Sequence, residues 1–232
     1  MIAGRGASSL VAGLKLGWAR LLGRRLAAIV VLSLAVTLVS ALIERRTASF
    51  GAADRALGVV TRWVIPLASF ALTTVVFDRE RLRDSVWSLA RFGLHRGRLA
   101  LGLELVAVAA ACLLAVLCVE VALVTCYGAR SGLGRDAWVS GWIAALGASA
   151  YIAWYSLAAC VLRAGRGRWL PLVCDFVFGS GTGGLAVIWP RAHLRNLIGD
   201  EPVLGLSQGS SSVVLAATAI VLLALASLRS GD

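Results

Sequence analysis

Six long apolar runs divide the chain, and short polar stretches between them carry most of its charged residues. A helix needs about 20 predominantly apolar residues to cross the hydrocarbon core of a bilayer. The pattern therefore predicts an all-α, polytopic membrane protein with a single transmembrane domain over residues 1–232. The six predicted spans cover residues 26–43, 57–77, 99–127, 138–162, 169–189 and 212–228.

Composition agrees with this interpretation and excludes one class of partner. The 232 residues are 59% hydrophobic and only 15% charged, whereas soluble domains are about half apolar and a quarter charged. The net charge of +11 is typical of nucleic-acid-binding proteins. Here the arginines cluster in alternate connections, and no RNA- or DNA-binding motif accompanies them, so we expect no nucleic-acid partner.

The basic residues also predict an orientation. Fifteen of the 23 lie at the termini or in the second and fourth connections, and seven lie in the remaining connections. Because cytoplasmic loops are enriched in Lys and Arg, both termini are expected in the cytoplasm. Arginine far outnumbers lysine amid abundant alanine, glycine and leucine, which is typical of a GC-rich bacterial genome. We therefore expect a multi-pass protein of the bacterial cytoplasmic (inner) membrane.

The segment before the first span is predicted to be helical. Leu10, Leu14, Trp18 and Leu21 recur at helical spacing, and basic residues occupy the rest of the surface. Residues 7–25 are thus predicted to form an amphipathic helix that lies on the inner leaflet, with membrane lipid as its partner. A disordered basic tail is the alternative.

The fifth span is irregular in sequence. Its centre, GSGTGG, holds four glycines in six residues, each of which lowers helix stability by about 1 kcal/mol relative to alanine. A break or a close helix contact is therefore expected near residues 179–184. The next stretch, 190–211, is too polar to span, so we expect an outer segment of short helices or one that dips partway back.

Four ionisable residues fall within the predicted spans, where charges usually face a partner or a wet cavity. Arg62 and Glu120 are expected at similar depths below the outer face of neighbouring spans, which predicts an ion pair between them. Glu104 and Asp175 are expected near cytoplasmic ends, facing a cavity or the interface. Each can contact substrate, carry a proton or pair with an interfacial arginine, and pairing is the favoured interpretation.

No catalytic or metal-binding pattern accompanies these charges. The five cysteines lack CxxC or Cys/His spacing, and the chain holds only two histidines. Ser180 in the glycine-rich run would need a histidine base to act as a nucleophile. His193 is expected at a different depth, beyond the outer end of the span, so it cannot serve as that base. The sequence therefore predicts no enzyme, no metal site and no cofactor in this chain.

The most polar stretch, FDRERLRDSVWSLARFGLHRGRLA, follows the second predicted span. With Asp78 as N-cap, a helix over residues 78–95 would align Leu82, Val86 and Leu89 in one apolar stripe, with charged residues opposite. It is too short and too charged to cross the membrane. We therefore expect it to lie at the cytoplasmic face.

This layout resembles the transmembrane subunit of an ABC-2-type (ABC exporter) permease. The run LARFGLHRGRLALGLELVAVAAA, residues 89–111, is similar to the passage from the coupling helix into the third span of that family. The segment IWPRAHLRNLIG, residues 188–199, is similar to the proline-containing segment before the last span. The acidic turn common before the coupling helix is replaced by DRERLRDS.

The resemblance implies that residues 78–95 form a coupling helix that docks on a separate ATP-binding subunit, which binds the ATP and Mg. It also implies a second permease, identical or related, and export as the predominant direction. The implied ATPase contacts are Arg79, Leu82, Arg83, Val86, Trp87, Leu89, Arg91 and Phe92. The alternatives are a helix that rests on anionic lipid, a membrane scaffold or sensor that recruits a cytosolic partner, and a proton-coupled secondary transporter.

Overall fold

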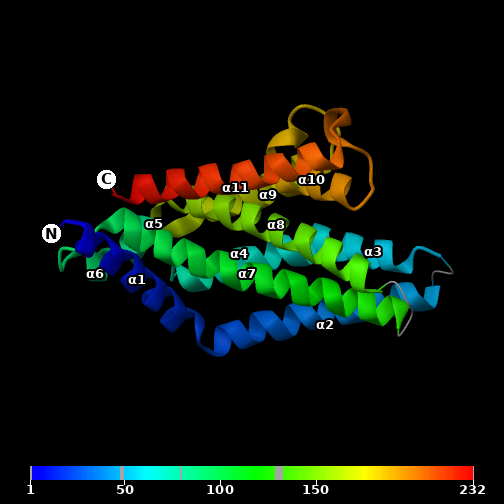
Figure 1. Cartoon of the computed structure of the whole chain (residues 1–232), viewed down its shortest axis with the longest axis horizontal. Coiled ribbons are helices and arrows are strands. Elements are labelled where there is room, and N and C mark those ends of the chain that lie inside the picture. The colour runs from blue at the N-terminus through cyan, green and yellow to red at the C-terminus, as the bar shows by residue number, and fades with distance from the viewer. Residues whose placement is uncertain (1, 48–49, 79, 129–132, 232) are drawn as a thin grey trace.

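The computed structural model describes residues 2–47, 50–78, 80–128 and 133–231, and within these ranges the regular structure is entirely helical. The start of α1 and the end of α11 lie at the same end of an elongated bundle (Figure 1). We call this the proximal end, and the opposite end, where α3 begins, the distal end. The all-α character predicted from the apolar runs is confirmed.

Five helices are long and apolar enough to cross a membrane. They are α2 (Arg24–Thr47), the continuous helix Ala52–Val76, α7 (Arg96–Tyr127), α8 (Leu133–Ala159) and α11 (Gln208–Gly231). The continuous helix consists of α3 (Ala52–Val59), a π-helical turn η1 (Val60–Val64) and α4 (Ile65–Val76). These helices coincide with five of the six predicted spans and extend beyond them into the flanking polar residues.

The centre of the bundle is α7, which packs against α1, α2, α8 and α11. Its 32 residues give it a length of about 48 Å, and it runs along most of the molecule (Figure 1). By contrast, α2 attaches along a narrow stripe of Ser33, Thr37 and Ala41 and leaves most of its large apolar side chains exposed.

The N-terminal helix α1 (Ile2–Leu21) packs directly against α7. The side it buries is the stripe Ser9, Gly13, Gly17 and Leu21, whereas Trp18 of the predicted apolar face is largely exposed. A Cβ at Gly13 would lie 2.3 Å from the Leu99 carbonyl oxygen. Small residues spaced by four let helix backbones approach this closely. The amphipathic pattern predicted the helix, and the glycines of this stripe, together with Leu21, determine which side packs against α7.

The predicted span 169–189 is not a continuous helix. Instead, α9 (Trp169–Phe178) ends after ten residues, and the chain continues through turns and η3 (Ala186–Ile188) to α10 (Pro190–Leu197). The break at Gly179 confirms the irregularity expected from the glycines. Beyond it, α10 and η4 (Val203–Gly205) are the short helices expected of the outer segment, and α10 packs on α8 and α11.

The connection between α4 and α7 forms two short helices at the proximal end, α5 (Leu82–Ser85) and α6 (Trp87–Ala90). Asp78 does not cap them, so this part of the prediction is wrong. Its φ of 53° is left-handed, and its N–H donates to the Val75 carbonyl, as in a chain reversal after a helix end. The reversal is required because α4 continues to Val76.

The close contact between α1 and α7 makes Gly102 intolerant of a side chain. A Cβ at Gly102 would lie 2.7 Å from both the Leu10 oxygen and the Leu14 nitrogen. We expect Gly102→Ala to lower the free energy of unfolding by about 1–3 kcal/mol, because two backbones must separate. Thermal unfolding in detergent measures this. Gly58→Ala is the matched control: its Cβ meets nothing within 4 Å, and improved helix propensity should leave stability equal or higher. Equal effects of the two changes would contradict the close contact.

Candidate functional sites

A buried ion pair joins the end of α9 to the start of α10. The Asp175 carboxylate accepts a hydrogen bond from Arg191 Nε at 3.2 Å and one from the Tyr151 hydroxyl at 2.9 Å on the same oxygen. Its other oxygen accepts the backbone N–H of Arg191 at 3.1 Å. All three residues are buried. The carboxylate thus satisfies one of the free N–H groups at the start of α10 and fixes the position of the arginine.

The far end of Arg191 reaches the π-helical turn of the second span. Pro66 has no N–H, so the Arg62 carbonyl four residues earlier lacks the hydrogen bond that it would accept in a regular helix. Arg191 Nη2 donates to this carbonyl at 2.7 Å. The Pro66 carbonyl accepts a side-chain hydrogen bond from the Tyr155 hydroxyl at 3.2 Å. Arg191 of α10 therefore supplies the donor that the proline removes, and Tyr155 of α8 adds a second bond to the same stretch of backbone.

Aromatic rings surround the guanidinium of Arg191. Its Cζ lies 3.8 Å from the ring centroid of Phe176 and 5.9 Å from that of Trp63. The two rings are themselves 4.8 Å apart. Cation–π contact of this kind strengthens when the cation is desolvated, as it is here.

The Arg62 side chain points towards the outer segment. Its Nη2 lies 2.7 Å from Asp200 Oδ2, and Arg195 Nε lies 3.4 Å from the same oxygen. The predicted Arg62–Glu120 ion pair is therefore wrong. Glu120 lies against α8, with Oε1 3.6 Å from the Cβ position of Gly141. The sequence indicates how deep Arg62 and Glu120 lie along their helices. It does not indicate the direction in which each side chain points, or that the outer segment brings Asp200 to the depth of Arg62.

The two remaining acids of the predicted spans differ in whether they have a partner. Asp175 forms an ion pair, which was the favoured interpretation. Its partner is Arg191 of α10, however, and not an arginine at the cytoplasmic interface. Glu104 on α7 is fully buried, and neither carboxylate oxygen has a hydrogen-bond partner among the described residues. An isolated ionised carboxylate is strongly disfavoured in such a place, and acids like this often mark ion or substrate pathways.

His193 has a structural position in the outer segment. Its Nε2 lies 2.7 Å from the Val187 carbonyl, and its Nδ1 lies 3.2 Å from Ser211 Oγ. Burial lowers the pKa of the imidazole, which the bond to Val187 only partly offsets. The Ser180 carbonyl accepts from Arg195. His193 therefore binds the Val187 carbonyl and the Ser211 hydroxyl, and neither ring nitrogen binds Ser180.

At the proximal end, three arginines bind backbone carbonyls around α5. Arg20 donates to the carbonyls of Val76 at 3.1 Å and Ser85 at 2.9 Å. Arg81 donates to Leu162 at 3.1 Å, and Arg168 donates to the Glu80 carbonyl. Arginines suit such positions because the last carbonyls of a helix have no partner within it. The polar stretch is therefore held by its own Arg81 and by Arg20 and Arg168 from other segments.

Burial changes the pKa of two of these anchoring arginines. Desolvation lowers the pKa of Arg20, although the charges of Asp78 and Glu80 oppose the shift. Desolvation lowers the pKa of Arg168 to about 10. Both side chains still carry their charge at neutral pH, so each donates charge-assisted hydrogen bonds.

The residues predicted to contact an ATPase separate into two groups. Leu82 and Val86 are fully buried against the bundle, so as placed they cannot contact a partner. Leu89 is half-buried, and Arg79 lies outside the described residues. The exposed members are Arg83, Trp87, Arg91 and Phe92. Trp87 and Phe92 are 53% and 72% exposed, each with an arginine 4.7–5.0 Å from its ring centroid.

Sequence reasoning missed the roles of Arg20, Tyr151, Arg168 and Arg191. Pro66 was the available signal for Arg191, because a proline inside a span implies an unpaired carbonyl that needs an external donor. Over the described ranges, no group of three or more His, Cys, Asp or Glu is placed to hold a metal ion. Comparison of the chain with family models, with curated proteins and with solved structures finds no match in any of the three.

The two ion pairs around Arg62 and Arg191 should contribute very differently to stability. Asp175→Asn leaves the Arg191 charge buried without its counter-ion, and we expect a loss of about 3–5 kcal/mol in the free energy of unfolding. Asp200→Asn breaks a half-exposed pair and should cost at most about 1 kcal/mol. Thermal unfolding of both variants in the same detergent compares them. A smaller effect for Asp175→Asn than for Asp200→Asn would contradict the buried network.

The outer segment should weaken under acid because of His193. A histidine whose folded pKa lies below its unfolded value near 6.5 favours the neutral form in the fold. Its stabilising contribution is fully present above that unfolded pKa and is lost as pH falls through the folded pKa. We expect the unfolding temperature to fall between pH 7 and pH 5, and His193→Gln to reduce this dependence. An unchanged pH profile in the variant would exclude His193 as its source.

Proposed function

We propose that the chain is the membrane-spanning permease subunit of an ATP-binding-cassette transporter of the ABC-2 type. It would move a substrate, outward in the predominant mode of that family, with ATP and Mg bound by a separate subunit. The observation that carries the proposal is the connection between α4 and α7. One face of α5 and α6 is fixed to the bundle, and the opposite face presents aromatic and arginine side chains at the end that holds both termini.

The fixed face supports transmission of movement. Leu82 and Val86 are buried, and Arg20 bonds to carbonyls on both sides of the chain reversal. Arg20 itself belongs to α1, which packs against α7 through backbone contact. A displacement of α5 and α6 would therefore be passed to the two spans that flank them and to α1, whereas a flexible loop would absorb it.

The exposed face has the composition of a protein-binding surface. Tryptophan and arginine are enriched among the residues that dominate binding energy at interfaces. Here Trp87 and Phe92 project with Arg83 and Arg91 beside them on a connection too short to have a core of its own. In the proposed complex these four side chains would contact the ATP-binding subunit. The buried Leu82 and Val86 and the half-buried Leu89 would hold α5 and α6 against the bundle.

A second candidate function is proton-coupled secondary transport, and Glu104 is the observation that favours it. A fully buried acid without a described partner can exchange a proton when the bundle opens. This function needs no ATPase, so the same purification that tests the permease proposal separates the two. Activity driven by a proton gradient without any ATP-binding partner would support this candidate and oppose the permease proposal.

The test is affinity purification of the full chain from its native membranes, with detection of a co-purifying protein that has a Walker-type nucleotide site. Phe92→Glu places a charge on the exposed face without touching the buried anchors. We expect it to reduce the retained ATPase and its activity by at least about tenfold, the size of a hot-spot loss.

Phe50→Glu provides the matched control. Phe50 is 86% exposed and precedes α3 at the distal end, so the same substitution there should leave the complex intact. Retention of folded protein is checked by gel filtration for both variants. The proposal fails if no Walker-type ATPase accompanies the wild-type chain, or if the two variants lose it equally.

A further inference from the structure

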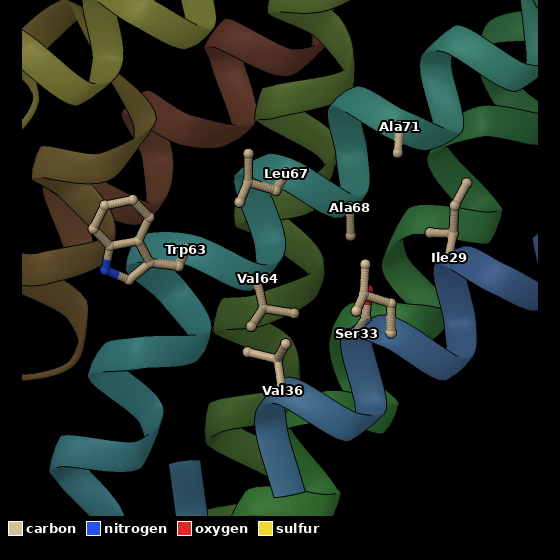
Figure 2. Close-up of a pocket in the computed structure, with 9 residues that line it drawn as sticks. Ile29, Ser33, Val36, Trp63, Val64, Leu67, Ala68 and Ala71 are labelled. Atoms are coloured by element: carbon tan, nitrogen blue, oxygen red, sulfur yellow. The ribbon is translucent and has the colours of Figure 1, made fainter. Parts of the chain in front are cut away.

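A narrow apolar groove runs between α2 and α4 on the outside of the bundle. In Figure 2 the side chains of Ser33 and Val36 from α2 face Val64 and Ala68 from the neighbouring helix. The groove exists because small residues on both helices leave space between the backbones. Its volume is about 160 Å³, and its lining comprises Ile29, Leu32, Ser33, Val36, Trp63, Val64, Leu67, Ala68 and Ala71.

A second hollow lies directly beyond the proximal end of this groove. It has a volume of about 380 Å³ and is lined by Arg20, Gly23, Arg24, Arg25, Val75 and Asp78. Val75 follows Ala71 by four residues on α4, and Arg25 precedes Ile29 by four residues on α2. Four residues advance a helix by about 6 Å, so on both helices the hollow lies about one turn from the groove.

The hollow carries positive charge that the protein neutralises only in part. Three arginines and one acid, Asp78, line it, and Glu80 lies close enough for its charge to act on Arg20 as well. Arg20 uses Nη1 and Nη2 on the carbonyls of Val76 and Ser85, and it forms no direct ion pair with either acid among the described residues. Arg24 and Arg25 are exposed, and neither takes part in an ion pair recorded for the described residues.

We propose that the groove and the neighbouring hollow together bind one anionic phospholipid from the leaflet at the proximal end. The phosphate headgroup would lie among Arg20, Arg24 and Arg25, and one acyl chain would lie in the apolar groove between α2 and α4. Charge complementarity selects this occupant: a neutral helix of a second copy would leave the arginines unmatched, and a free phosphate would leave the groove empty.

The two parts of the site contribute in different ways. A lipid tail is as apolar as leucine, so the groove supplies fit but little preference among lipids. Preference comes from the headgroup, since each arginine near an anionic membrane surface favours binding about fivefold. The arginines should therefore select lipids by headgroup charge, and the groove should bind the acyl chain of the selected lipid. The inference does not depend on the permease proposal, because it requires only that the chain lies in a membrane.

The experiment uses the full chain in nanodiscs that contain equal amounts of phosphatidylglycerol and phosphatidylcholine. Native mass spectrometry then measures which lipid stays bound on ejection. We expect phosphatidylglycerol to be retained preferentially, and the double change Arg24→Gln with Arg25→Gln to reduce that preference by about 25-fold, about fivefold for each arginine. The matched control, Arg45→Gln with Arg46→Gln, removes the same charge from the distal end of α2 and should leave the preference unchanged.

Three further outcomes test the groove itself. Ala71→Phe fills the groove and should reduce lipid retention, whereas Ala217→Phe on an exposed part of α11 should not. Soluble glycerol phosphate, which lacks acyl chains, should not displace the lipid. The proposal is overturned if both arginine pairs have equal effects, if glycerol phosphate competes, or if Ala71→Phe abolishes a dimer rather than lipid binding.

Discussion

Buried backbone groups must find partners within the protein, and the break after α9 and the proline in the second span both leave such groups to be satisfied. The chain gives up a continuous helix at Gly179 and, because of Pro66, a hydrogen bond in the neighbouring span. Arg191 meets both needs: its backbone and Nε bind Asp175, and its Nη2 binds the Arg62 carbonyl. The pair thus holds the outer segment, α9 and the second span in one arrangement.

The same chemistry recurs at the proximal end, where arginines rather than helix caps satisfy exposed carbonyls. Arg20, Arg81 and Arg168 each donate to a carbonyl of another segment. Of the three, only Arg81 belongs to the polar stretch after the second span, and Arg20 and Arg168 bind carbonyls of that stretch from other segments. Arg83 and Arg91 are exposed and have no such carbonyl partner among the described contacts, which separates residues that hold the connection from residues that are free to bind.

Hydropathy was sufficient to predict five spans, the broken segment and the polar connection, because each is a property of a local window. Packing partners were not predictable in this way. Depth placed Arg62 beside Glu120, but the returning outer segment brings Asp200 there instead. The leucine spacing of α1 predicted a helix but not the side that packs against α7, which Gly13 and Gly17 determine through backbone contact. Both cases concern rotation about a helix axis, which a sequence pattern constrains only weakly when several faces are apolar.

The thin attachment of α2 has a consequence for how the protein is made. Its most apolar window has a mean hydropathy of 2.8 and is only 17% buried, whereas the corresponding window of α8 has 1.3 and is 61% buried. A helix that is stable in lipid by itself can leave the insertion machinery as soon as it is synthesised. One that depends on Tyr151 meeting Asp175, which is synthesised later, cannot. The order of synthesis therefore places an independent anchor ahead of α8, the helix that most needs a completed bundle around it.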